Sequence, residues 1–230
     1  MTAAEPHPKF PMATFTEPSP RGFLYLGLEV VAPGPGPFVR RSAERDTEVA
    51  GLTELAEALE KVPEVAAVHV YRAVMIPPIR GGPRFDLAVL VETTSPEDIS
   101  AVRSTSHYRD IGATFAMPAR NVERIGRTDA SRPGTMLFNH FTAPDPDRAV
   151  AVWQTLTGWY TDKTGIDNST ALVPLEEAPY ALVNYARLPD GPGRFLFQQL
   201  LRPSFHRFVR ARLAAHDMKA MPVLCEPVRP

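Results

Sequence analysis

The spacing of apolar residues changes along the chain, and each change predicts a different element. Residues 23–31 form a short run of aliphatic and aromatic side chains that a string of prolines and glycines closes, as is typical of a strand. Residues 46–62 instead place Val49, Leu52 and Leu55 at helical spacing, with glutamates on the opposite face. The chain therefore begins with a strand followed by an amphipathic helix.

Further runs in the first half complete the order β-α-β-β-α-β. The segment between the second and third strands is rich in proline and glycine and is short enough for an antiparallel hairpin. Ser95-Pro96 has the pattern of a helix N-cap followed by proline in the first turn. The predicted elements are strands at 65–76 and 85–93, a helix at 95–115 and a final strand at 121–126.

The same order of elements returns in the second half, which predicts an internal duplication. Its last helix must bend near Pro203, because proline lacks the amide proton that a helix needs. Ser106-His107-Tyr108-Arg109 has a short echo in Ser204-Phe205-His206-Arg207. The predicted elements are strands at 136–142, 169–175, 180–188 and 219–228, with helices starting at 145 and spanning 194–216.

Each half is predicted to be a ferredoxin-like α+β unit, whose antiparallel sheet carries helices on one face only. The bare faces need a partner, so we expect the two tandem units to pack sheet against sheet as an α+β barrel. The expected boundaries are a flexible tail at 1–22, an N-terminal half at 23–127, a linker at 128–134 and a C-terminal half at 135–230.

Composition narrows the classes of function. The chain is 44% hydrophobic and 22% charged with a net charge of −1, which is typical of a globular protein and argues against a nucleic-acid partner. No run of about 18 apolar residues predicts a membrane span. The absence of an export signal favours a cytoplasmic location. Cys225 is the single cysteine, which excludes an intramolecular disulfide and a structural thiolate zinc site.

The tandem pattern, with FDLAVLVETTSPEDISAVRSTSHYRDI at 85–111 and FLFQQLLRPSFHRFV at 195–209, resembles the dimeric α+β barrel superfamily. That superfamily contains antibiotic-biosynthesis monooxygenases, stress-responsive barrel proteins and polyketide cyclases. The resemblance implies a small hydrophobic aromatic ligand between the sheet and the helices of one unit. It also implies O2 as co-substrate and no tightly bound cofactor. It leaves open whether the protein uses reduced flavin or haem and whether it forms a homodimer.

Polar and aromatic residues of the second half are candidates for this site. Adjacent strand residues point to opposite faces, so Asn139 and His140 cannot both face one pocket. The aromatic residues on the helix could equally be core, and His206 could cap the bend at Pro203. The candidate catalytic residues are His140 and His206, and the candidate substrate-binding residues are Asn139, Trp153, Tyr160, Asn184, Gln198 and Arg207.

Together with these residues, the resemblance implies an enzyme of specialised metabolism, an oxygenase for a phenolic, polyketide-like substrate. His140 or His206 would accept the phenolic proton, and the indole and phenol rings would position the substrate ring. A polyketide cyclase or aldol-type enzyme in the same pocket is one alternative. A non-catalytic ligand-binding or stress-response barrel is the other.

Overall fold

The computed structural model describes residues 7–129 and 134–228, and in them eight strands join into one closed barrel. The strand order is β1-β3-β2-β8-β5-β7-β6-β4, and every neighbouring pair is antiparallel. Closure removes the free edges that an open sheet would expose. The strands are β1 (Gly22–Leu28), β2 (Val65–Met75), β3 (Leu87–Thr93), β4 (Phe115–Ile125), β5 (Met136–Thr142), β6 (Ser169–Pro174), β7 (Leu182–Arg187) and β8 (Lys219–Pro227).

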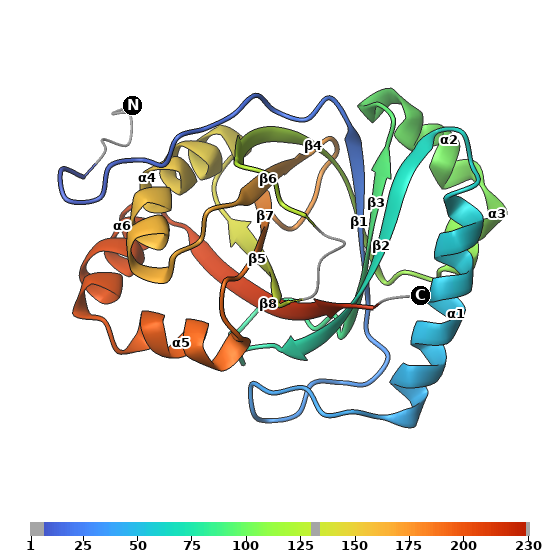
Figure 1. The fold of residues 1–230 in the computed structure, drawn as a ribbon, viewed down its shortest axis with the longest axis horizontal. Coiled ribbons are helices and arrows are strands. Elements are labelled where there is room, and N and C mark those ends of the chain that lie inside the picture. The colour runs from blue at the N-terminus through green and yellow to red at the C-terminus, as the bar shows by residue number, and fades with distance from the viewer. Residues whose placement is uncertain (1–6, 130–133, 229–230) are drawn as a thin grey trace.

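Helices lie outside the barrel on two opposite sides (Figure 1). One group packs against the strands of the first half and the other against those of the second half. No helix of the described residues is long and apolar enough to cross a membrane. The helices are α1 (Ala43–Leu59), α2 (Ile99–Ser104), α3 (Ser106–Asp110), α4 (Pro146–Thr164), α5 (Pro192–Leu200) and α6 (Ala211–Ala215), with a 3₁₀ turn at Pro96–Asp98 and a π-helix at Phe205–Arg210.

The prediction of an α+β barrel with antiparallel strands is confirmed. The first four strands follow the order β4-β1-β3-β2, and the last four repeat it as β8-β5-β7-β6. The two groups do not remain separate sheets, because β2 pairs with β8 and β4 pairs with β6. The sheets that we expected to pack face to face therefore form one continuous wall around a shared interior.

Two elements differ from the sequence-based prediction. The helix expected at 95–115 is divided, because the extended backbone of Thr105 ends α2 while its hydroxyl accepts a hydrogen bond from the Tyr108 amide to begin α3. The final strand of the first half begins at Phe115 instead of residue 121, since its first residues pair with β1. The predicted break near Pro203 is confirmed, because α5 ends at Leu200 and helical structure resumes at Pro203, ahead of the π-helix.

Aromatic rings fill the barrel interior. Tyr25 of β1 stacks on Phe138 of β5 with ring centroids 5.1 Å apart, and Phe138 stacks on Tyr185 of β7 at 5.8 Å. Tyr71 of β2 meets Phe138 edge-on at 5.0 Å. Because strand residues alternate between faces, the remaining apolar strand residues point outward and form separate cores beneath the helices. Side chains from both halves thus share the central core.

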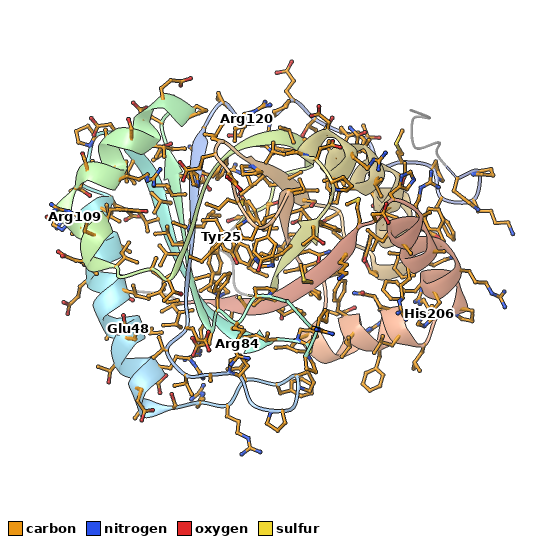
Figure 2. The ribbon with its side chains drawn as sticks, turned by 180° about the vertical axis from the view of Figure 1, so that it is seen from behind. Tyr25, Glu48, Arg84, Arg109, Arg120 and His206 are labelled. Atoms are coloured by element: carbon orange, nitrogen blue, oxygen red, sulfur yellow. The ribbon has the colours of Figure 1, made fainter. Side chains whose placement is uncertain are left out.

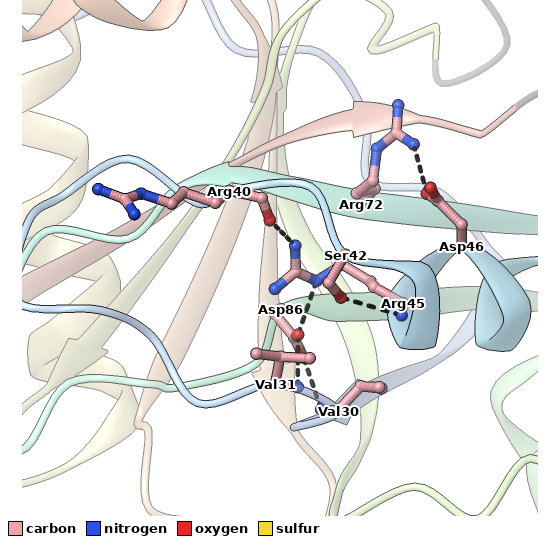
Figure 3. A network of polar contacts seen from close by, with 8 residues as sticks. All are labelled: Val30, Val31, Arg40, Ser42, Arg45, Asp46, Arg72 and Asp86. Carbon is pink, nitrogen blue, oxygen red and sulfur yellow. Dashed lines mark hydrogen bonds and ion pairs between the residues drawn. The ribbon is translucent and has the colours of Figure 1, made fainter.

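A buried ion pair holds the loop after β1 against the first turn of α1 (Figure 3). The carboxylate of Asp86 is fully buried and accepts hydrogen bonds from the Val30 amide at 2.7 Å, the Val31 amide at 2.9 Å and Arg45 Nε at 2.8 Å. Arg45 also donates to the backbone carbonyl of Arg40. Several donors therefore satisfy this carboxylate, as a buried charge requires.

Residues 7–21 differ from the flexible tail that the sequence suggested, because they pack along α4 and β4. Phe10 is 8% exposed and belongs to the core beneath α4. The Ala13 amide donates to Thr157 Oγ1 at 3.0 Å, and the Ser19 amide donates to Asn121 Oδ1 at 2.7 Å. One buried ring and two hydrogen bonds from backbone amides thus attach this segment to the barrel, although its proline content suggested a flexible tail.

Candidate functional site

A small pocket, which we call the α4 pocket, lies between α4 and the outer face of β5, β6 and β7, with a cavity volume of about 40 Å³. Strand alternation builds it, because every second residue of these strands points toward α4. The register places Asn139 of β5 directly opposite Asn184 of β7, so two amides lie side by side on one wall. The lining residues are Ile125, Leu137, Asn139, Phe141, Trp153, Leu156, Thr157, Tyr160, Thr161, Ile166, Ser169, Asn184 and Ala186.

The amide of Asn139 is the least satisfied polar group of this pocket. Asn139 is 6% exposed, and its Oδ1 has no hydrogen-bond partner among the described residues. Its neighbour Asn184 donates from Nδ2 to Ser169 Oγ at 2.9 Å. A buried acceptor without a partner costs about 1–3 kcal/mol, so a ligand O–H or N–H placed here would gain a hydrogen bond that the protein does not supply.

Aromatic residues of α4 form the opposite wall. Trp153 is 5% exposed and packs against Phe15 with ring centroids 5.9 Å apart. Burial raises the pKa of Tyr160, so its phenol stays protonated and acts as a hydrogen-bond donor. The structure therefore brings together Asn139, Trp153, Tyr160 and Asn184 in one pocket, and their role in binding a substrate stays a prediction.

His140 lies on the other side of the sheet, inside the barrel, and does not reach this pocket. Its side chain is fully buried, with Nδ1 3.0 Å from the Met221 carbonyl and Nε2 3.0 Å from the Tyr25 hydroxyl. A carbonyl only accepts, so Nδ1 carries the proton and Nε2 accepts from Tyr25. Burial lowers the pKa of His140 to about 4. The side chain that we expected to accept a proton is thus neutral near pH 7 and lies in the barrel interior.

His206 and the residues around the bent helix also lie outside the pocket. Figure 2 shows His206 on the outer helices, far from Tyr25 in the barrel. Its Nε2 lies 2.9 Å from the carbonyl of Leu200, the last residue of α5, so it caps the helix end. Arg207 is exposed and Gln198 is half-buried, and neither lines the cavity. The break between α5 and the π-helix turns this face outward, which corrects the expected convergence.

The candidate residues did not include three polar lining residues, Thr157, Thr161 and Ser169. Ser169 is the first residue of β6, and strand alternation alone could have placed it beside Asn184. Thr161 follows Tyr160 on α4, and no pattern distinguished it from the other threonines of that helix.

Some proteins of the superfamily that this chain resembles bind haem. The residues that line the α4 pocket, however, offer no ligand for a haem iron. No imidazole, thiolate or thioether is present among its lining residues, and Tyr160 holds its phenolic proton. No basic side chain lines the pocket to pair with a flavin phosphate. In the described part of the chain, no three His, Cys, Asp or Glu side chains gather to hold a metal ion.

Comparisons with known proteins show the fold. No family model and no curated protein matches the sequence. An anthrone oxidase-like protein is 10% identical with a TM-score of 0.62, covering 92% of both chains. A candidate monooxygenase of Fusobacterium nucleatum subsp. nucleatum is 7% identical with a TM-score of 0.51, covering 91% of this chain and 92% of its own. A mutant chlorite dismutase of Candidatus Nitrospira defluvii is 13% identical with a TM-score of 0.51, covering 93% of each.

These likenesses show the fold of the chain and not its activity. At identities of 7–13% the likeness concerns the arrangement of the backbone. It does not extend to the side chains of the pocket. The function therefore has to be argued from the pocket itself.

Proposed function

We propose that the protein is an oxygenase-type enzyme that binds a small phenolic aromatic compound between α4 and the sheet. The observation that carries the proposal is the buried, unpartnered Oδ1 of Asn139 in a pocket with indole and phenol walls. An aromatic ring would lie along Trp153 and Tyr160, and its hydroxyl would donate to Asn139. The oxidative names of the structural neighbours support the same reaction class.

The chemistry of such a reaction rests on the substrate. The paired amides of Asn139 and Asn184 offer an acceptor for a phenol and donors for a phenolate, so they stabilise the anion that forms. An electron-rich anion can reduce O2 directly. A methylene between two aryl rings then becomes a carbonyl, and the second oxygen atom leaves as water. In this reaction the substrate supplies all the electrons.

In the proposed reaction the proton acceptor is not a histidine, in contrast to the expectation from the sequence. Neither His140 nor His206 lines the pocket, and Tyr160 is the one titratable lining residue. We therefore propose that the proton leaves to water while the amides hold the anion. This predicts that the rate of oxidation rises with pH as the hydroxyl of the substrate ionises.

The size of the cavity sets a further condition. A volume of about 40 Å³ holds a few water molecules, whereas ligand sites for drug-sized molecules have about 300–1,000 Å³. A polyketide-like substrate would therefore enter only if Tyr160 or Trp153 moved. Tyr160 is half-buried at the rim, which makes it the first candidate for that movement.

We also propose that the barrel arose from two tandem β-α-β-β-α-β units, with boundaries at 23–127 and 135–230. The repeated strand order supports this history. The interior of the barrel would then be the former interface of two copies, while each ligand pocket would lie on an outer face, beneath its own helices. In this chain the C-terminal half supplies the lining residues of the α4 pocket except Ile125 of β4.

Oxygen uptake with anthrone, whose enol form is a phenol and whose methylene lies between two aryl rings, tests the function. We expect saturable O2 consumption by the wild-type protein and a loss of about tenfold or more in kcat/KM for Asn139→Leu, because one buried hydrogen bond to the substrate is removed. Gln198→Ala is the matched control, since Gln198 lies outside the cavity, and it should keep wild-type rates. No O2 uptake with any phenol would contradict the proposal.

A second candidate function is ligand binding without catalysis. The lack of an acid-base group besides Tyr160 among the lining residues favours it. Saturable binding of 1-naphthol that Asn139→Leu abolishes, with no O2 consumption, would establish that function. Conversion of a substrate under nitrogen would instead indicate a cyclase or aldol-type reaction.

A further inference from the structure

A second and larger cavity opens at one end of the barrel, with a volume of about 540 Å³. We call it the barrel mouth and define it by Arg21, His69, Glu92, Arg124, Arg127 and Tyr185. Inward-pointing residues near the ends of β2, β3, β4 and β7 form most of it, so it continues the shared interior of the barrel. Its volume lies within the range of sites for small organic ligands.

The barrel mouth and the α4 pocket lie on opposite faces of the same strands. Ser169 lines the α4 pocket while Thr170 lines the mouth, and Asn184 and Tyr185 divide in the same way. This follows from the period of two residues along a strand. The mouth is therefore a separate site, and an inference about it does not depend on the proposed oxygenase function.

Glu92 in the mouth is already neutralised by its neighbours. Arg21 forms an ion pair with Glu92 Oε2, and His69 Nε2 lies 3.6 Å from Glu92 Oε1. Burial alone would raise the pKa of Glu92, but the contacts with His69 and Arg21 outweigh burial and lower that pKa. Glu92 is thus ionised and paired, so it neither attracts a second cation nor strongly repels an anion.

Two further arginines give the mouth an excess of positive charge. Arg124 is held in place because its Nε donates to the Glu17 carbonyl at 2.7 Å. Arg127 is exposed at the rim. Counting Arg21, Arg124 and Arg127 against Glu92 and Asp129 leaves one net positive charge with His69 neutral. Guanidinium groups bind carboxylates through paired, charge-assisted hydrogen bonds.

The inner wall of the mouth is aromatic. Phe23 and Tyr185 line it, and Tyr185 stacks on Phe138 of the barrel interior. Tyr71 lies between His69 and Phe138, and its fully buried hydroxyl has no hydrogen-bond partner among the described residues. A ligand that combines a planar apolar body with an anionic end would match both the rings within and the arginines at the rim.

We propose that the barrel mouth binds a small aromatic carboxylate, with the carboxylate at Arg124 and Arg127 and the ring against Phe23 and Tyr185. The occupant is a free small molecule, because the cavity accommodates a ligand of one or two rings and narrows inward to a packed core. Among the lining residues, the arginines outnumber the carboxylates by one, and a bound carboxylate would balance that charge.

Calorimetric titration of the full-length protein with 2-naphthoate tests the proposal, with neutral 2-naphthamide as the matched ligand. We expect saturable binding of the naphthoate and at least tenfold weaker binding of the naphthamide, since a charge-assisted pair contributes about 1.5–3 kcal/mol. Arg127→Gln, at an exposed position that folding does not need, should weaken naphthoate binding about five- to tenfold. Arg124→Gln should act in the same direction.

The control variant is Arg84→Gln, which removes a surface arginine of the same charge that pairs with Glu29 away from the mouth. It should leave the dissociation constant within about twofold of the wild-type value. Absence of saturable naphthoate binding, equal binding of the naphthamide, or unchanged binding in both Arg127→Gln and Arg124→Gln would overturn the proposal. So would weakening by Asn139→Leu alone, because the ligand would then occupy the α4 pocket.

Discussion

His140 is a titratable side chain sealed inside the barrel, so it makes the stability of the protein depend on pH. Its pKa is about 4 in the folded state, against about 6.5 in an unfolded chain. Protonation therefore favours the unfolded state, and the stabilisation is present above about pH 6.5 and is lost as the pH falls toward 4. Between pH 7.5 and pH 4.5 this one group should remove about 2–3 kcal/mol from the free energy of unfolding.

The variant His140→Gln measures this contribution, because glutamine can donate to the Met221 carbonyl and accept from Tyr25 without titrating. Urea unfolding at several pH values should show a shallower loss of stability in the variant than in the wild type. If the stability of the variant and of the wild type depended on pH in the same way, the prediction that His140 is buried and neutral would be contradicted. His206→Gln is the control, since that side chain is exposed.

The same residue shows what the sequence could and could not predict at this scale. Strand periodicity requires Asn139 and His140 to face opposite sides, and that much is confirmed. Periodicity does not tell which of the two faces α4, because both faces of the strand are buried here and hydrophobic contrast is lost. His206 lies away from the pocket for a different reason, because the chain breaks after α5 and the following helix turns this side chain outward.

Helix α4 carries the clearest contact between elements that the sequence did not reveal. A Cβ atom added at Gly158 would lie 1.9 Å from the carbonyl oxygen of Pro11, so glycine allows the N-terminal segment to lie directly on the helix. Gly158→Ala should displace residues 7–13 even though alanine favours helix formation by about 1 kcal/mol. Limited proteolysis should then cut residues 7–21 faster than in the wild type.

A matched substitution is available in α1, because Gly51 is exposed and an added Cβ there would meet nothing within 4 Å. Gly51→Ala should raise the free energy of unfolding by about 0.5–1 kcal/mol and leave the rate of cleavage in residues 7–21 unchanged. If Gly158→Ala also left cleavage unchanged, the close packing of the segment on α4 would be contradicted.

At the scale of elements, the order of strands and helices could be read from the sequence because each amphipathic period is local. The strands at 65–75 and 136–142 agree with their predicted limits to within one residue. Closure of the barrel could be expected only in outline, since it depends on the pairing of β2 with β8 and of β4 with β6, which are distant in sequence. The shape of the pocket was the least predictable feature, because it depends on side-chain packing that no local sequence pattern encodes.

Closure of the barrel predicts that the two halves unfold as one unit. The two tryptophans of the chain, Trp153 and Trp159, both lie on α4, so their fluorescence reports on the C-terminal half. Asp86 lies in the first half, where its loss leaves the guanidinium of Arg45 buried without its carboxylate. Asp86→Asn should therefore lower the free energy of unfolding by about 3–5 kcal/mol. Because the β2–β8 and β4–β6 pairings and the barrel interior join the two halves, tryptophan fluorescence should report the full decrease in the free energy of unfolding.

The comparison with Asp46→Asn makes this prediction specific, because Asp46 pairs with Arg72 at the surface and its loss should change stability by less than about 1 kcal/mol. Urea transitions followed by tryptophan fluorescence and by far-ultraviolet circular dichroism should coincide in the wild type and in both variants. A fluorescence transition that stays in place while the circular dichroism moves would mean that the halves unfold independently. The β2–β8 and β4–β6 pairings would then contribute little coupling, and the barrel would behave as two units in contact.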